Sequence, residues 1–169
     1  MTEISKEYFA MQDLGRETMD YVRSIVKPGM NLRQLRAECE EYMLSRGADS
    51  FWWCGVGAFM FSGDETAVSV VPESGYEAAD KLIGSDDIIT IDLSPQRQGV
   101  WGDFARTLIL EDGKLVRDIK DIKNEEWRGG LFMEELLHET LLDIAGEDMT
   151  FEELHRRIDA LAEEKGYRN

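Results

Sequence analysis

Two aspartates inside apolar segments are the residues of this sequence with the clearest potential for chemistry. Asp92 stands in the segment 88–93 and Asp103 in the segment 100–110, and we interpret these segments as paired strands joined by a turn. A carboxylate in a buried strand costs free energy unless a metal ion, a basic group or hydrogen-bond donors compensate its charge. Two such carboxylates, roughly side by side on paired strands, predict a cation bound between them.

Three nearby residues are candidates for supporting roles. Thr107 could hydrogen-bond to a metal ligand through its hydroxyl group. Trp101 stands in the turn before Asp103, where we expect an aromatic side chain close to a ligand. Arg106 could bind substrate, pair with an aspartate or form an ion pair that serves the fold alone. The alternative to a metal ion is that Arg106 and Arg97 neutralise the two aspartates.

The composition narrows the class of protein. The chain has 169 residues, enough for one domain with a hydrophobic core. Its formal net charge is −16, with 35 acidic against 19 basic residues. This argues against nucleic acid as a partner, because phosphate binding requires clustered Lys and Arg. The N-terminus is polar and acidic, and no apolar run approaches the roughly 20 residues needed to span a bilayer. We therefore expect a cytoplasmic protein that does not bind membranes.

Helical periodicity lies on both sides of a β-rich segment. The spacing of apolar residues predicts two helix pairs, over 3–26 and 31–46, then 122–145 and 150–165. Short strands are predicted between the pairs, at 51–54, 56–61 and 67–71, ahead of the two Asp-bearing strands. At an offset of 119 residues the second helix pair resembles the first, and the N-cap candidates Asn31 and Thr150 coincide.

This similarity predicts an internal duplication of helix–helix–sheet units. The chain would then be a single incomplete domain, 1–169. Residues 1–112 would form a complete first α+β unit, and 113–169 would contribute the helices of a second unit whose strands are missing.

The segments around the two aspartates contain a longer pattern. Gly84–Leu93 is an apolar strand that carries Asp92, and Gly99–Thr107 contains a glycine turn, an aromatic residue, Asp103 and Arg-Thr. The two aspartates are eleven positions apart. In these features the chain resembles the pita-bread superfamily, which includes methionine aminopeptidases, aminopeptidase P, prolidase and creatinase. The resemblance covers residues 3–169 and implies an α+β pita-bread fold.

The resemblance also implies a metal-dependent hydrolase. In the superfamily the first Asp is usually bidentate on one metal ion and the second bridges two ions, which assigns these roles to Asp92 and Asp103. Two divalent cations (Mn, Co, Fe or Zn) would then activate a water that cleaves a peptide or C–N bond. The implied substrate is a peptide or a small amide.

The chain departs from the superfamily pattern in two respects. The superfamily completes its site with a His and two Glu from later strands, but the two histidines here, His138 and His155, fall on predicted helices. Peptidase members also carry a substrate-contacting His before the first Asp, whereas 51–112 contains none. We therefore expect this chain to carry only part of a dinuclear site and to be inactive alone, and no catalytic residue is identified.

Two other functions stay open at this stage. A non-catalytic pita-bread domain would bind a peptide or a protein, and the lack of His in 51–112 favours it. A dimerising interaction protein would use the unpaired sheet edges of a half-domain to form a homodimer. Metal titration would separate the first of these from a hydrolase, and sedimentation would test the second.

Overall fold

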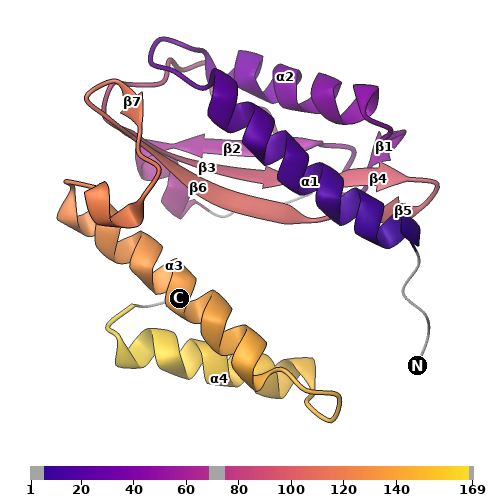
Figure 1. Ribbon diagram of the computed structural model, residues 1–169, viewed down its shortest axis with the longest axis vertical. Coiled ribbons are helices and arrows are strands. Elements are labelled where there is room, and N and C mark those ends of the chain that lie inside the picture. Colours follow the sequence, from indigo (N-terminus) through magenta and orange to yellow (C-terminus); the bar gives the residue numbers. More distant parts are fainter. Residues whose placement is uncertain (1–5, 69–74, 168–169) are drawn as a thin grey trace. The chain divides into compact units, whose positions relative to one another are not determined.

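The computed structural model describes residues 6–68 and 75–167. The chain divides into two compact units, Met1–Arg117 and Asp118–Asn169 (Figure 1). The first unit contains the sheets and two helices, and the second contains a helix pair. The candidate metal ligands both lie in the first unit.

Two amphipathic helices, α1 (Lys6–Ile25) and α2 (Leu32–Ser45), cover one face of the main sheet (Figure 1). Their inward residues recur at three- and four-residue steps, as expected for helices packed on a core. The buried apolar side chains of the two helices are those of Met11, Leu14, Met19, Val22, Leu32, Leu35, Cys39 and Met43. Asn31 begins α2 as its N-cap, because its side chain accepts a hydrogen bond from the Arg33 amide at 2.9 Å.

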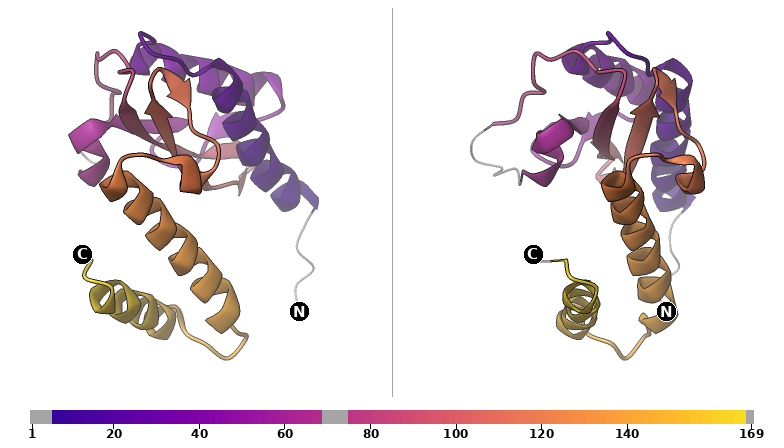
Figure 2. Two further views of the ribbon diagram at one scale, coloured as in Figure 1. Left: turned by 60° about the vertical axis from the view of Figure 1, so that its left-hand side comes forward. Right: turned by 90° about the vertical axis from the view of Figure 1, so that its left-hand side faces the viewer.

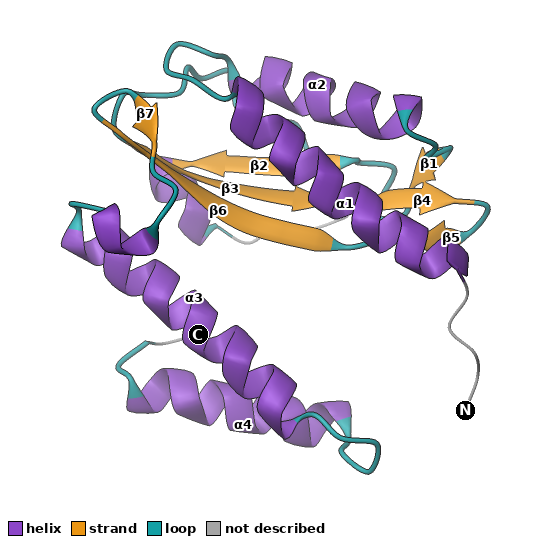
Figure 3. Ribbon diagram, viewed as in Figure 1, coloured by secondary structure: helices purple, strands orange, loops and turns teal. Residues whose placement is uncertain are grey.

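The strands form two antiparallel sheets (Figure 3). The main sheet has the order β2 (Ala58–Ser62), β3 (Asp87–Leu93), β6 (Phe104–Glu111) and β7 (Lys114–Leu115). The smaller sheet has the order β1 (Ser50–Phe51), β4 (Pro95–Arg97) and β5 (Val100–Trp101). One long hairpin runs through both sheets, because β3 leads directly into β4 and β5 leads directly into β6.

The hairpin keeps one register from end to end. Leu93 lies opposite Phe104 in the main sheet, and Gln96 lies opposite Trp101 in the smaller one, so the two strands advance by the same number of residues between these pairs. Its tip is a two-residue turn in which Gln98 and Gly99 have φ of 52° and 79°. Positive φ at both central residues matches the right-handed twist of the flanking strands.

Three sequence predictions differ from the observed strands. The predicted strand 51–54 continues only to Phe51, and residues 52–55 form a turn in which Cys54 and Gly55 have positive φ. The predicted strand 100–110 is broken at Gly102 and Asp103, where the hairpin passes between sheets. Most of the predicted strand 67–71 lies outside the described residues, and Ala67 ends a 3₁₀ helix, η1 (Gly63–Ala67).

Burial alternates along β3 and separates two faces of the main sheet. Ile89, Ile91 and Leu93 have no exposed surface and join the core beneath α1 and α2. Thr90 and Asp92, like Ile88, are only half-buried. Because successive side chains of a strand point to opposite faces, Asp92 lies on the face turned away from α1 and α2.

The outer edge of β2 is already hydrogen-bonded. The Tyr76 hydroxyl accepts from the Met60 amide at 2.6 Å and donates to the Met60 carbonyl at 2.7 Å. The Lys81 ammonium donates to the Ser62 carbonyl at 2.9 Å. A second chain that added a strand here would have to displace both side chains, so a homodimer through this edge stays a prediction that these contacts disfavour.

The second unit contains a 3₁₀ turn, η3 (Ile119–Asp121), and a helix hairpin, α3 (Glu125–Ile144) and α4 (Phe151–Glu164) (Figure 2). These helices have 20 and 14 residues, the lengths of α1 and α2. Each begins 119 residues after its counterpart. None of the helices among residues 6–68 and 75–167 combines the length and apolarity needed to cross a bilayer.

The N-cap of α4 gives a local stability prediction. Thr150 Oγ1 accepts a hydrogen bond from the Glu153 amide at 3.1 Å. We expect Thr150→Ala to cost the helix start about 1 kcal/mol, which corresponds to a roughly fivefold loss of hydrogen-exchange protection at the Glu153 amide. Thr150→Ser keeps the acceptor and should retain the protection. Equal exchange in the two variants would contradict this role.

Candidate metal site

Asp92 is placed by the central strand β3. Its register partners are Phe59 on β2 and Ala105 on β6, so its carboxylate lies between two neighbouring strands on the face away from α1 and α2. Asp92 is half-buried. This differs from the expectation of a carboxylate enclosed in a buried strand, because the alternation of β3 turns it out of the helix-covered core.

Asp103 is placed by the break between β5 and β6. Continuing the register from the Leu93–Phe104 pair sets Asp103 opposite Ser94 and makes it a diagonal neighbour of Asp92. Diagonal neighbours share a face and are close enough for their side chains to interact. The two aspartates are therefore brought together, and Asp103 is the more exposed of the two.

The local electrostatics disfavour the ionised form of both groups. Burial raises the pKa of Asp92, and the nearby charge of Asp103 raises it further. Burial also raises the pKa of Asp103. A bound cation would reverse this effect, because a positive charge between two carboxylates favours their ionised forms.

Neither arginine considered from the sequence neutralises the pair. The Arg106 guanidinium lies 4.3 Å from the centre of the Phe104 ring and donates to the Ala105 carbonyl. Arg97 lies near Asp49 instead, where hydrogen bonds from Ser50 and from the Gln98 amide lower the pKa of the carboxyl and the charge of Arg97 adds a smaller effect. Among the residues that the structure describes, the two candidate aspartates make no ion pair or hydrogen bond with a basic side chain. The neutralisation by arginine considered above is therefore wrong.

The other candidates from the sequence fall in different places. Thr107 lies opposite Thr90 in the β3–β6 pair, and their hydroxyl oxygens are 3.3 Å apart. Thr90 precedes Asp92 by two residues, so both threonines lie on the same face of the sheet as Asp92. Arg106 lies opposite Ile91 and so on the other face of the sheet from Asp92. We therefore leave it out of the proposed site.

Trp101 belongs to an aromatic cluster beside Asp103. Its ring centre lies 5.3 Å from that of Trp52 and 5.7 Å from that of Tyr8, and it is 43% exposed. The sequence interpretation missed Thr90, although its position two residues before Asp92 on a strand is a signal for a shared face. It also missed the contact between Trp52 and Gly102, which are too far apart in sequence for any local pattern to join them.

The chemistry of the pair fits a divalent metal ion. Two carboxylates share one face without a basic partner, and hard or borderline divalent cations accept such oxygen ligands. Within residues 6–68 and 75–167, no group of three or more His, Cys, Asp or Glu side chains could hold a metal ion. His138 and His155 lie on α3 and α4, as predicted. The described site is thus a ligand pair.

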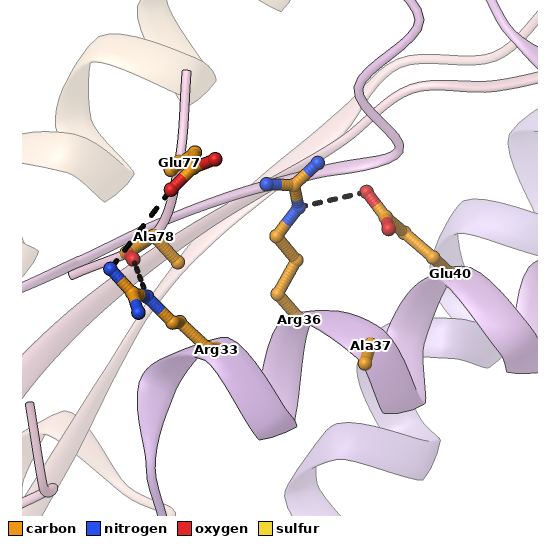
Figure 4. A pocket seen from close by; sticks show the side chains of 6 residues that line it. All are labelled: Arg33, Arg36, Ala37, Glu40, Glu77 and Ala78. Atoms are coloured by element: carbon orange, nitrogen blue, oxygen red, sulfur yellow. Dashed lines mark hydrogen bonds and ion pairs between the residues drawn. The ribbon is translucent and has the colours of Figure 1, made fainter. Parts of the chain in front are cut away.

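A pocket of about 310 Å³ lies beside α2 and is lined by acidic and basic side chains (Figure 4). In Figure 4, Arg36 and Glu40 point toward one another, and their Nε and Oε1 atoms are 2.9 Å apart. Arg33 donates to the Ala78 carbonyl at 2.9 Å. The same Glu40 oxygen accepts from the Gly57 amide at 2.9 Å. These groups connect α2 to its neighbouring segments, and we assign them no ligand.

Comparisons with known proteins place this geometry in context. The model of metallopeptidase family M24 matches residues 7–169. No curated protein matches the chain. Among solved structures, the chain is similar to an X-Pro aminopeptidase from Thermotoga maritima MSB8, with a TM-score of 0.78 and 18% identity over 96% of this chain and 40% of that one.

Two prolidases show the same likeness. The prolidase from Pyrococcus horikoshii OT3 has a TM-score of 0.77 and 20% identity over 97% of this chain and 43% of that one. The prolidase from Pyrococcus furiosus has a TM-score of 0.74 and 21% identity over 96% and 44%. The α+β pita-bread fold predicted from the sequence is confirmed, and the chain spans less than half the length of these structures.

Proposed function

We propose, because this chain belongs to metallopeptidase family M24, that Asp92 and Asp103 are two ligands of a dinuclear divalent-metal centre that hydrolyses a peptide bond. The observation that carries the proposal is the geometry of this pair. Two carboxylates lie diagonally on one sheet face, at adjacent strands, without a basic partner among the described residues. A structural role would leave two like charges together with nothing to offset their repulsion.

The residues of this chain would bind and orient the metal ions. Asp92 stands on an interior strand of a four-stranded sheet, which is a rigid support, and Asp103 stands at the corner of the same hairpin. The hydroxyl groups of Thr90 and Thr107 lie on the same face and could hydrogen-bond to the carboxylates once these hold an ion. Two bound cations, which we propose to be Mn, Co, Fe or Zn, would supply an activated water and polarise the scissile carbonyl.

The centre needs more ligands than this pair. Two carboxylates bind a divalent cation weakly, and the chain spans only 40–44% of the peptidase structures that it resembles. We propose that further ligands come from protein outside these residues, and that the substrate of the completed site is a peptide, as the names of the similar structures suggest.

We expect the 169-residue chain alone to show no peptide turnover with Mn²⁺, Co²⁺, Fe²⁺ or Zn²⁺. The measurement is the release of amino acids from Xaa-Pro dipeptides and tripeptides, with metal-free buffer as the background. Turnover that disappears in Asp103→Ala would contradict this expectation and would show that the chain completes the site without other ligands.

The role of the two aspartates as metal ligands is tested by titrating Mn²⁺ and following water-proton relaxation. We expect weak binding by the chain and a loss of at least tenfold in affinity in both Asp92→Asn and Asp103→Asn. The matched control is Asp143→Asn, which removes one exposed carboxylate from α3 in the second unit. Equal Mn²⁺ affinity in all four proteins would refute the site and would favour a non-catalytic domain that binds peptide or protein.

A further inference from the structure

Gly102, the residue before Asp103, has both of its backbone polar groups engaged. Its amide donates to the Pro95 carbonyl at 2.8 Å, which joins the two strands of the hairpin. Its carbonyl accepts a hydrogen bond from the indole Nε1 of Trp52 at 2.9 Å. The corner of the hairpin is therefore held by one strand partner and by one side chain from a segment fifty residues earlier.

Helix α1 closes the third side of this corner. A Cβ atom on Gly102 would lie 2.7 Å from the carbonyl carbon of Met11 and closer still to its oxygen. These are backbone atoms of a helix and cannot turn aside as a flexible side chain can. Gly102 is buried, and its φ is not among the positive ones, so the position requires glycine for space alone.

Trp52 connects both Asp-bearing strands at the same corner. Its backbone amide donates to the Ser94 carbonyl at 3.2 Å, while its indole binds Gly102 on the opposite strand. Its ring also packs on that of Trp101, with 5.3 Å between centres. Ser94 follows Asp92 by two residues and Gly102 precedes Asp103 by one, so Trp52 links the segments that carry the two carboxylates.

We propose that Trp52, together with the backbone of α1 at Met11, acts as a positioning element that sets Asp103 relative to Asp92. The proposal rests on the proposed metal site and assigns Trp52 and Gly102 a role in its assembly. The position of the Asp103 carboxylate depends on the backbone at Gly102, because its side chain makes no ion pair or hydrogen bond with the described residues. Metal–ligand distances tolerate only small displacements, so a loose corner would weaken metal binding.

The test compares Trp52→Phe with Trp53→Phe. Both changes replace an indole by a phenyl ring, but only the first removes the hydrogen bond to Gly102, because the indole of Trp52 is its donor. Trp53 lies on the same turn and is 42% exposed. We expect Trp52→Phe to weaken Mn²⁺ binding about tenfold and Trp53→Phe to change it less than twofold. In the metal-free protein, NMR should show the Asp103 amide resonance shifted by Trp52→Phe and unchanged in Trp53→Phe.

The two measurements separate the two proposals. If wild-type chain binds no Mn²⁺, the metal site fails, while the amide shift still decides whether Trp52 positions Asp103. If Mn²⁺ binds and Asp103→Asn abolishes it, but the two tryptophan variants behave alike, the positioning role of Trp52 is overturned and the metal site stands. An unmoved Asp103 resonance in Trp52→Phe overturns the positioning role in either case.

Gly102→Ala is a second and stronger variant. The new methyl group must push the hairpin corner away from α1, so we expect a larger loss of Mn²⁺ affinity than in Trp52→Phe and a larger shift of the Asp103 amide. The melting temperature of each metal-free protein, from circular dichroism, shows whether it is folded. A folded Gly102→Ala protein with wild-type Mn²⁺ affinity would overturn the role of this close approach.

Discussion

Replacing Asp92 by asparagine should raise the melting temperature of the metal-free protein by a few degrees and remove the stabilisation that Mn²⁺ gives to the wild type. The first effect follows because burial and the charge of Asp103 both raise the pKa of Asp92, so its ionised form destabilises the fold at neutral pH. The second follows because a ligand that binds only the folded state stabilises it, and the variant lacks a ligand atom of that site.

The pH dependence has a definite sign. A carboxyl whose pKa is raised by folding contributes stability that is fully present below its unfolded pKa, about 3.9 for Asp. That stability is lost as the pH rises through the raised pKa of the folded protein. The gain in melting temperature of Asp92→Asn over the wild type should therefore be largest near pH 7 and vanish below about pH 4.

Calorimetry of metal-free and Mn²⁺-loaded proteins measures both effects. Asp143→Asn is the control for the loss of one negative charge, because that residue is exposed on α3. It should leave both the melting temperature and the Mn²⁺ effect close to those of the wild type. A lower melting temperature for metal-free Asp92→Asn would mean that its carboxylate stabilises the fold without a metal ion, which would contradict this prediction.

Replacing Ile91 by alanine should destabilise the protein by about 2–5 kcal/mol, the usual cost of a buried Ile→Ala change. Ile91 has no exposed surface and belongs to the core between the main sheet and the helices α1 and α2. It also stands next to Asp92 on the strand that supports the metal ligand. The loss of packing should therefore destabilise the strand itself. Urea denaturation measures the change in the free energy of unfolding.

Ile88→Ala is the matched control for this change. Ile88 lies on the same strand but is half-buried on the other face. Truncation of Ile88 should lower the free energy of unfolding clearly less than truncation of Ile91, because the change removes less buried apolar surface. Similar losses in the two variants would mean that the face of β3 carrying Asp92 is as tightly packed as the helix-covered core.

Much of the fold was predictable from local patterns. The capping residues Asn31 and Thr150 mark the starts of α2 and α4, and the side chain of each accepts a hydrogen bond from an amide of the helix that it begins. The strands around Asp92 and Asp103 were predicted from apolar runs and turn residues within one short segment. Such signals come from backbone preferences and neighbouring residues, so one segment is enough to detect them.

The strand predictions failed where distant groups decide the conformation. The segment 52–54 is aromatic and reads as a strand, yet Trp52 uses its amide and indole to bind two different strands. The break at Gly102 depends on contact with α1, some ninety residues earlier in the chain. Neither partner could be inferred from the residues around it.

The sequence alone identified the two carboxylates, their strands and the family resemblance, because all three depend on residue type and short spacing. Only the tertiary structure decided that Thr107 shares the face of Asp92 while Arg106 does not, and that Trp52 holds the corner beside Asp103. The reason is physical: strand register and packing are set by contacts between distant segments. A shift of the register by one residue would exchange the two faces of a strand and change every cross-strand pair that it makes.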